Sequence, residues 1–384
     1  MKWLVLALLV VLTACRGQTQ TEETFVEAEV TLPVIVDDTV FVPGFVVPET
    51  SETPEATEVY EPEPVPIFPN EVGEIMILVY HGLHEAQPGP YDRLTADFWN
   101  DLQILYDQGY RLISLEDLIN NNITTPAGYT PIVLSFDDGL PSAFSLKELE
   151  DGTLAPSPGT AVYILNAFYE KNPSFGRTAI FFVNAWRDPF EGAGTLEARF
   201  NYLIDNGFEI GNHSYNHLDF SRLNAQQLQQ EMGSLDQFIR QHVPDYKLFA
   251  MAYPFSIRPR QGLRHYALAG KYNDVSYRYA WALRVGNTGV PAVPYHIRFD
   301  PLNVSRVVPG DQSTPYRNVP DLGYLLRHFE AHPYLRFISD GDPETVTVPR
   351  SNVHYVNKYR LGDKKLVVYD RYEEEKDQET DVAG

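Results

Sequence analysis

Two adjacent carboxylates close an apolar run in the segment PIVLSFDDGLPSAF, residues 131–144. The run has the composition of a buried strand, and two acids at its end repel each other and lose hydration. A bound cation would offset that repulsion, so Asp137 and Asp138 are candidates for a metal ligand and a neighbouring free base. The simpler alternative is an Asp-Gly turn in which Asp137 caps the helix that follows.

Two histidines four residues apart could supply the other metal ligands. His213 and His217 stand in HSYNH, directly after the apolar segment FEIGN at 208–212. On a helical turn, side chains at i and i+4 face the same way and can bind one ion. Two imidazoles and one carboxylate would leave positions open for water and substrate. The second carboxylate could then take a proton from an attacking water.

Strand-like and helix-like segments alternate along the chain and would bring these side chains together. The strand-like segments are apolar on both faces, which is typical of a parallel sheet covered by helices. In such sheets, functional side chains stand at the carboxyl ends of strands, and closure into a barrel is favoured at this length. The strand-like segments are 74–82, 110–114, 130–139, 178–184, 208–214 and 248–255, and the helix-like segments are 95–109, 160–173, 195–207 and 224–243.

The composition divides the chain into four segments. Residues 1–14 combine one lysine with an apolar run too short to span a bilayer, which is typical of a signal peptide. Leu-Thr-Ala-Cys resembles a bacterial lipobox, so we expect the only cysteine, Cys15, to be acylated; an ordinary secretion signal is the alternative. We expect an acidic, disordered Pro/Thr/Glu-rich stalk at 15–72, a barrel at 73–350, and a C-terminal extension with an acidic tail at 351–384. Together these features predict an extracytoplasmic, membrane-anchored bacterial lipoprotein.

The net charge of −22 is concentrated at the two ends of the chain. Residues 16–72 carry −12, residues 363–384 carry −4 and Lys2 contributes +1, which leaves −7 for residues 73–362. A mildly acidic folded part gives no electrostatic basis for binding nucleic acid, so that class of partner is excluded.

Four segments of the chain resemble motifs of one enzyme family. SFDDG and HSYNH resemble the first two motifs of the polysaccharide deacetylases, the NodB-homology carbohydrate esterases of family 4, and AYPF resembles the third. ILVYHG resembles an upstream segment found in one branch. The resemblance covers roughly residues 75–345. It implies a distorted (β/α)7 barrel and hydrolysis of N-acetyl groups, which are linear amides, from a polysaccharide that contains N-acetylglucosamine, such as peptidoglycan or an exopolysaccharide.

The resemblance also implies roles for individual residues and one divalent metal ion, most often zinc, with cobalt or nickel as alternatives. Asp137 matches the base that activates a metal-bound water, and the metal ligands match Asp138, His213 and His217. The third motif, Tyr253, Pro254 and Phe255, is expected to contact the substrate and to offer the Phe255 N–H to the oxyanion.

The match departs from the family pattern at two places. The arginine that orients the base in the third motif is replaced here by Ala252, so Arg258 or Arg306 has to take over. No clean copy of the histidine that acts as general acid is present, and the candidates are His296, His328 and His332.

Three further residues are weaker candidates for the site. His81 follows the first strand, where it could line the same mouth and support the metal ligands, with a packed strand-end histidine as the alternative. Arg306 is expected to contact the base carboxylate, with a structural salt bridge as the alternative. Trp281 could be an aromatic platform for a sugar ring, with core packing as the alternative.

The missing general acid keeps two alternative functions open. An O-acetyl esterase acting on xylan or another polysaccharide would depend less on a general acid, because an alcohol leaves more easily than an amine. A weakly active glycan-binding barrel would retain the metal without efficient turnover. A free Asp137 favours an enzyme, since a binding protein has no use for the second carboxylate.

Overall fold

The computed structural model of the protein describes residues 67–86, 89, 91–286, 293–310 and 319–370. The predicted signal peptide, Cys15 and the predicted stalk up to residue 66 lie outside the described residues, as does the acidic end beyond residue 370. Within the described residues, no helix combines the length and apolar character that crossing a membrane requires.

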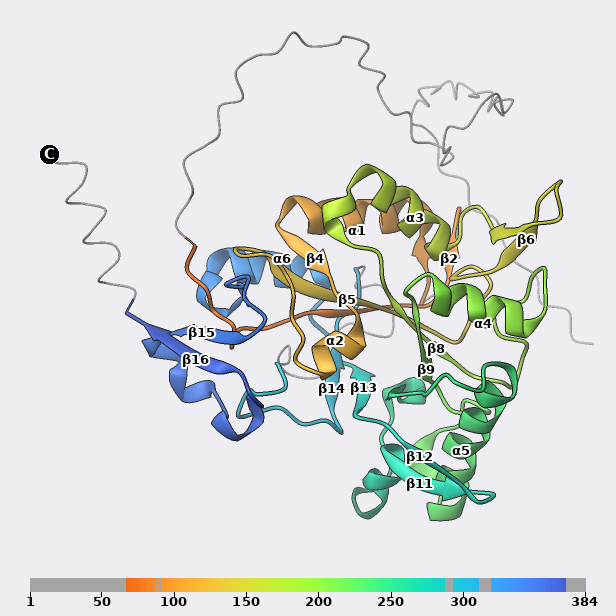
Figure 1. The fold of residues 1–384 in the computed structure, drawn as a ribbon. Helices are drawn as coiled ribbons and strands as arrows, with labels where there is room; N and C mark the ends of the chain where they lie inside the picture. The colour runs from red at the N-terminus through yellow and green to blue at the C-terminus, as the bar shows by residue number, and fades with distance from the viewer. Residues whose placement is uncertain (1–66, 87–88, 90, 287–292, 311–318, 371–384) are drawn as a thin grey trace, which may run out of the picture. The chain divides into compact units, whose positions relative to one another are not determined.

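A parallel sheet curls into a nearly closed barrel at the centre of the described residues (Figure 1). Strand β14 approaches β1 because Val79 donates its N–H to the Val307 carbonyl at 2.9 Å and Val307 donates to Ile77 at 2.8 Å. The predicted (β/α)7 barrel is therefore confirmed. In sheet order the strands are β1 (Ile77–Tyr80), β5 (Thr130–Asp137), β8 (Ile180–Val183), β9 (Glu209–Asn212), β10 (Ala250–Ala252), β13 (Trp281–Val285) and β14 (Val304–Arg306), with β4 (Tyr110–Leu112) paired to the start of β5.

Helices lie on the outside of this sheet and bury their apolar sides against it (Figure 1). Local capping sets where they begin: Thr160, Thr195 and Asn224 each accept a hydrogen bond from the backbone three residues later. Asn224 and Gln227 form a reciprocal capping box. The helices are α1 (Thr95–Asp107), α2 (Leu115–Ile119), α3 (Ala161–Lys171), α4 (Leu196–Asp205), α5 (Ala225–His242) and α6 (Leu322–Ala331).

Small two-stranded sheets and short 3₁₀ turns complete the described part. The strand pairs are β2 (Leu83–His84) with β3 (Arg93–Leu94), β6 (Leu146–Glu148) with β7 (Leu154–Pro156), β11 (Ala269–Tyr272) with β12 (Val275–Arg278), and β15 (Thr345–Pro349) with β16 (Lys365–Tyr369). One 3₁₀ turn, η3 (Pro254–Ser256), follows β10 directly.

Strand β5 shows how side-chain alternation builds both core layers. Leu134 and Phe136 face the helices, where Phe136 stacks between Tyr80 and Phe181 with ring centroids 5.3 and 5.0 Å apart. Each such aromatic pair adds about 0.5–1.5 kcal/mol to the free energy gained by burial. Val133 faces the inside of the barrel, and because successive side chains alternate, Asp137 also points inward.

The folded part extends beyond the predicted barrel limits of 73 and 350. Asn70 and Glu71 are already buried, because Asn70 donates to the carbonyls of Tyr334 and Arg336 while Glu71 accepts from the backbone of Thr347. At the other end, β16 pairs along its length with β15, so residues 365–369 also belong to the folded part.

Candidate active site

A cleft of about 750 Å³ opens at the carboxyl ends of the barrel strands. This is the end at which parallel barrels place their functional side chains. The titratable and aromatic side chains that line it are His81, His84, Tyr91 and Asp92 after β1, Asp137 and Asp138 at the end of β5, Arg187 after β8, His213 and His217 after β9, and Tyr253 and Phe255 after β10.

Three of the predicted residues converge at the floor of this cleft. The Oδ1 atom of Asp138 lies 3.5 Å from Nε2 of His213 and 3.4 Å from Nε2 of His217. One donor atom from each residue lies within 4.8 Å of the other two. The backbones of Asp138 and His217 have φ of 73° and 54°, a left-handed conformation that costs roughly 1–3 kcal/mol for residues other than glycine. The turns after β5 and β9 are therefore held in strained shapes that point these side chains at one another.

Neighbouring groups fix the orientation of these three side chains. His213 lies with Nδ1 2.9 Å from the Ala252 carbonyl, and since a carbonyl only accepts, Nδ1 carries the proton and Nε2 keeps its lone pair. Asn184 donates to Oδ1 of Asp138 at 3.2 Å. Burial, followed by the charge of His213, lowers the pKa of His217 to about 4, so the His217 ring is neutral near pH 7.

The donor set fits a divalent metal ion bound to nitrogen and oxygen. Bonds of about 2.0–2.1 Å in a tetrahedral zinc site place the ligand atoms about 3.3–3.4 Å apart. The distances from Asp138 to His213 and His217 match that spacing, and no cationic side chain pairs with Asp138 among the described residues. Two neutral imidazoles and a carboxylate suit zinc, and they suit cobalt or nickel as well.

The other carboxylate, Asp137, is held by an arginine. Arg306 from β14 donates from Nη1 to Oδ1 at 2.6 Å and from Nη2 to Oδ2 at 2.7 Å. Both side chains are almost completely buried. Burial alone would raise the pKa of Asp137, but the charges of Arg306 and His213 outweigh it and hold the pKa well below its ordinary value. Asp137 is therefore ionised and oriented, and Arg306 rather than Arg258 takes the place of the missing motif arginine.

His81 also lines the cleft and lies close to Asp137. Its Nε2 atom lies 3.9 Å from Oδ2 of Asp137, and 15% of its side chain is exposed. Burial lowers the pKa of His81, against the opposing charge of Asp137. The ring also packs against Tyr91, with centroids 5.5 Å apart. His81 thus lines the cleft mouth, as the sequence analysis allowed.

The third motif forms another wall of the cleft. The ring of Phe255 meets that of His217 edge-on, with centroids 4.4 Å apart, and its side chain is 62% exposed. Its φ of 54° turns the chain sharply after β10. Tyr253 is buried and donates to the Leu302 carbonyl, which leaves Phe255 as the accessible aromatic group of the motif.

Several predicted residues lie away from the cleft. Trp281 stands at the amino end of β13, inside the barrel, where it is 4% exposed and packs on Phe299; it is a core residue and not a sugar platform. His296 stacks on Tyr355. His328 and His332 pack on each other at the end of α6, so none of the three predicted general-acid candidates lines the cleft.

Four titratable or aromatic residues of the cleft escaped the sequence analysis, namely His84, Tyr91, Asp92 and Arg187. His84 and Asp92 form an ion pair with Nε2 and Oδ2 3.1 Å apart, and Arg187 follows β8. His84 and Asp92 flank the segment between β1 and α1, which shows no pattern of helix or strand. A signal was present for Arg187, since it follows a strand end as Asp138 and His213 do.

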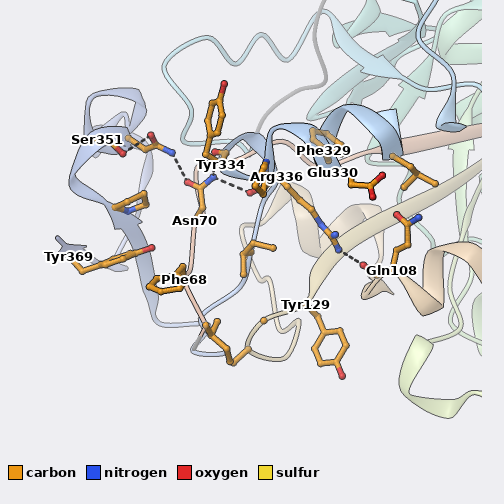
Figure 2. Close-up of a pocket in the computed structure, with 18 residues that line it drawn as sticks. Phe68, Asn70, Gln108, Tyr129, Phe329, Glu330, Tyr334, Arg336, Ser351 and Tyr369 are labelled. Atoms are coloured by element: carbon orange, nitrogen blue, oxygen red, sulfur yellow. Dashed lines mark hydrogen bonds between the residues drawn. The ribbon is translucent and has the colours of Figure 1, made fainter. Parts of the chain in front are cut away.

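A second cavity of about 800 Å³ lies near the amino end of β5 (Figure 2). Asn70 donates to the Arg336 carbonyl across it, and Arg336 donates to the carbonyl of Gln108 at 2.6 Å. Its lining contains the carboxylate of Glu330 but no histidine or cysteine that could join it in binding a metal. The reactive groups of the described residues therefore belong to the first cleft.

Comparisons with known proteins gave a match to one protein family. Residues 125–272 match the family model "Polysaccharide deacetylase". A search of curated proteins gave no significant match.

Similar solved structures include three from bacteria. The deacetylase PplD of Streptococcus pyogenes in complex with acetate is 18% identical, with 67% of this chain and 98% of that chain covered and a TM-score of 0.48. BC0361, a polysaccharide deacetylase from Bacillus cereus, is 17% identical, with coverages of 63% and 67% and a TM-score of 0.45. A de-N-acetylase from Aggregatibacter actinomycetemcomitans is 16% identical, with coverages of 66% and 99% and a TM-score of 0.45.

Proposed function

The chain carries a polysaccharide deacetylase domain over residues 125–272, and from this premise we propose that it is a metal-dependent hydrolase. Its substrate is a polysaccharide containing N-acetylglucosamine, such as peptidoglycan or an exopolysaccharide, from which it removes N-acetyl groups. The observation that carries this proposal is that two adjacent carboxylates have different partners. Asp138 lies 3.5 and 3.4 Å from the Nε2 atoms of His213 and His217, whereas both oxygens of Asp137 accept hydrogen bonds from Arg306.

Asp138, His213 and His217 would hold the divalent ion, with zinc the best fit to their donors. The ion, when bound, supplies a Lewis acid at the bottom of the cleft. Asp137 would take the proton from the water that attacks the acetyl carbonyl carbon. Arg306 keeps this carboxylate ionised and fixes its direction, because two parallel hydrogen bonds leave it no rotational freedom.

Two residues beside the metal ligands would complete the reaction. The backbone N–H of Phe255 would stabilise the negative charge that develops on the carbonyl oxygen. His81 would receive the proton that Asp137 takes from the water and would deliver it to the nitrogen of the leaving amine, since its Nε2 atom lies 3.9 Å from Oδ2 of Asp137 at the cleft surface. A proton donor at this position favours amide hydrolysis over the ester hydrolysis that a missing general acid would suggest.

Acetate release from N-acetylglucosamine oligosaccharides, with and without added zinc, tests the proposed activity. Asp137→Asn should abolish release while the protein retains its metal, measured by mass spectrometry of the metal content. His217→Ala should lose both the metal and the activity. If Asp137→Asn turned over at the wild-type rate, Asp137 would not be the base.

The role of His81 is tested by the leaving group. His81→Gln should slow amide hydrolysis at least a hundredfold but slow hydrolysis of an activated aryl acetate much less, because a phenolate leaves without a proton. An equal loss on both substrates would indicate that His81 acts on the site structure and not as an acid. Acetylated xylan is the third substrate of this comparison, and preferential acetate release from it would favour the esterase function.

We also propose that Cys15 anchors the protein to a membrane outside the cytoplasm. This proposal rests on the sequence Leu-Thr-Ala-Cys at the end of an apolar leader. Metabolic labelling with an alkyne fatty acid should mark the wild-type protein but not Cys15→Ser, which should also shift from the membrane fraction to the soluble fraction. Labelling of Cys15→Ser to the wild-type level would exclude this anchor.

A further inference from the structure

Arg187 stands out among the charged residues of the catalytic cleft because it has no acidic partner among the described residues. It follows strand β8 and lines the cleft. The adjacent carboxylate, Asp188, is engaged elsewhere, since both of its oxygens accept from Arg199 at 3.0 and 2.8 Å. The guanidinium of Arg187 is therefore not neutralised by the fold.

The other charged side chains of the cleft are engaged, either in pairs or at the proposed metal site. Asp137 pairs with Arg306, and Asp92 lies 3.1 Å from Nε2 of His84 and accepts the N–H groups of two glycines. Asp138 belongs to the proposed metal site. Arg187 consequently gives this part of the cleft a positive charge, and a bound divalent ion would add to it.

Folding also removes part of the Arg187 side chain from water without providing it with a hydrogen-bond partner. Its Nε atom is buried and makes no hydrogen bond within the described residues. An unpaired buried donor is unfavourable, and proteins seldom keep one unless a ligand or water satisfies it. The guanidinium carbon lies over the ring of Trp186, 4.2 Å from its centroid, and this contact restricts its orientation.

A restricted guanidinium with free N–H groups is a receptor for an oxyanion. Its fork matches the two oxygens of a carboxylate or a phosphate, which lysine cannot match in the same way. The ring of Trp186 is 53% accessible and lies next to the guanidinium outside the cleft lining, so a sugar that extends past Arg187 would meet an apolar surface there. The ligand that fits both features is an acidic sugar.

We propose that Arg187 is a specificity residue that selects polysaccharides bearing a carboxylate or phosphate close to the acetylated sugar. This inference rests on the proposed function, since it places the acidic group in the same cleft as the N-acetyl group. The negative charge can come from a lactyl or uronyl carboxylate on the sugar chain or from a phosphodiester in the backbone. Neutral chains of N-acetylglucosamine would bind in the same cleft with lower affinity.

Equilibrium binding tests this preference separately from turnover. The probes are three oligosaccharides of equal length: neutral N-acetylglucosamine units, alternating units that carry a lactyl carboxylate, and units joined by phosphodiesters. Calorimetry with the zinc-loaded Asp137→Asn protein should show that at least one acidic probe binds ten times more tightly than the neutral one. Adding Arg187→Gln should reduce that ratio about tenfold, and Arg187→Lys should restore part of it.

Arg278→Gln is the matched control, since it removes the same charge from exposed strand β12 outside the cleft lining and should leave the binding ratio unchanged. The same ratio measured as kcat/KM, with Asp137 intact, provides a second reading that does not depend on the Asp137→Asn protein. Equal affinity for acidic and neutral probes, or a ratio insensitive to Arg187→Gln, would overturn the proposal. Absence of acetate release with an Arg187-dependent binding ratio would reject the deacetylase activity and retain the anion site.

Discussion

Replacing Arg306 by leucine should destabilise the protein strongly, because it leaves the carboxylate of Asp137 buried without its partner. The two side chains share two short hydrogen bonds, and Arg306 and Asp137 are 1% and 3% exposed. Removing one partner of such a buried pair costs about 3–5 kcal/mol of unfolding free energy. At about 2–4 °C per kcal/mol for a domain of 150–250 residues, the melting temperature should fall by roughly 6–20 °C.

The size of this loss of stability depends on whether other groups can offset the charge of Asp137 once Arg306 is removed. The Nε2 atoms of His81 and His213 lie 3.9 and 3.8 Å from Oδ2 of Asp137, and either can offset the charge only when protonated. Burial lowers the pKa of His81, so at pH 8 this ring gives no such relief. The metal-free protein at that pH should therefore show the larger end of the range.

A double-mutant cycle, measured by unfolding in urea, separates the interaction free energy of Arg306 and Asp137 from the destabilisation that each substitution causes by itself. Arg306→Leu, Asp137→Asn and the double variant should give a coupling free energy of about 2–3 kcal/mol, because losing the second partner costs little once the first is gone. Arg306→Lys should fall between the wild type and Arg306→Leu, since it keeps the charge and loses the fork.

The control cycle uses Arg199 and Asp188, an ion pair of the same type in which the carboxylate side chain is 51% exposed. Arg199→Leu also loses a hydrogen bond to the Phe190 carbonyl, but its coupling to Asp188→Asn should be only about 0–1 kcal/mol. If the Arg306 cycle were additive within about 0.5 kcal/mol, the claim that Arg306 compensates a buried charge would be refuted.

The remaining predictions concern pH, metal and local structure. Burial raises the pKa of Glu71 to about 8, with the N–H of Thr347 opposing, so the folded state binds this proton more tightly than the unfolded chain. Stability should therefore fall by a few kcal/mol as the pH rises from about 4.5 to 8, and Glu71→Gln should flatten that slope in urea titrations of the metal-free protein. Chelation should stop acetate release and zinc should restore it, whereas a rate unaffected by chelator would exclude the metal role of Asp138. Asn224→Ala should cost about 1 kcal/mol through loss of the helix cap and leave kcat/KM unchanged, which thermal unfolding and acetate release would check.

Short-range patterns were sufficient to predict the barrel and the residues at its strand ends. Apolar segments of strand length alternate with segments of helical period, and parallel strands place their carboxyl ends together. The adjacent acids at 137 and 138 and the histidines four residues apart therefore had to meet if the sheet closed in chain order. Capping residues such as Asn224 likewise act within one turn of the chain, so they can be recognised without tertiary information.

Contacts between distant strands could not be predicted in this way. Arg306 reaches Asp137 across 169 residues of sequence, and the choice of Arg306 over Arg258 depends on β14 closing the barrel beside β1. Trp281 was misplaced because the sequence analysis did not identify strand β13, of which Trp281 is the first residue.

The sequence by itself therefore determined which chemical groups this protein owns and which of them stand at the ends of strands, since those features are written in local spacing. Tertiary structure decided which charges are paired. In the folded protein, Asp137 is buried in an ion pair with Arg306, whereas Arg187 lines the cleft without an acidic partner among the described residues. The physical reason is that charge compensation depends on distances of a few ångströms between segments whose separation along the chain carries no information about their proximity.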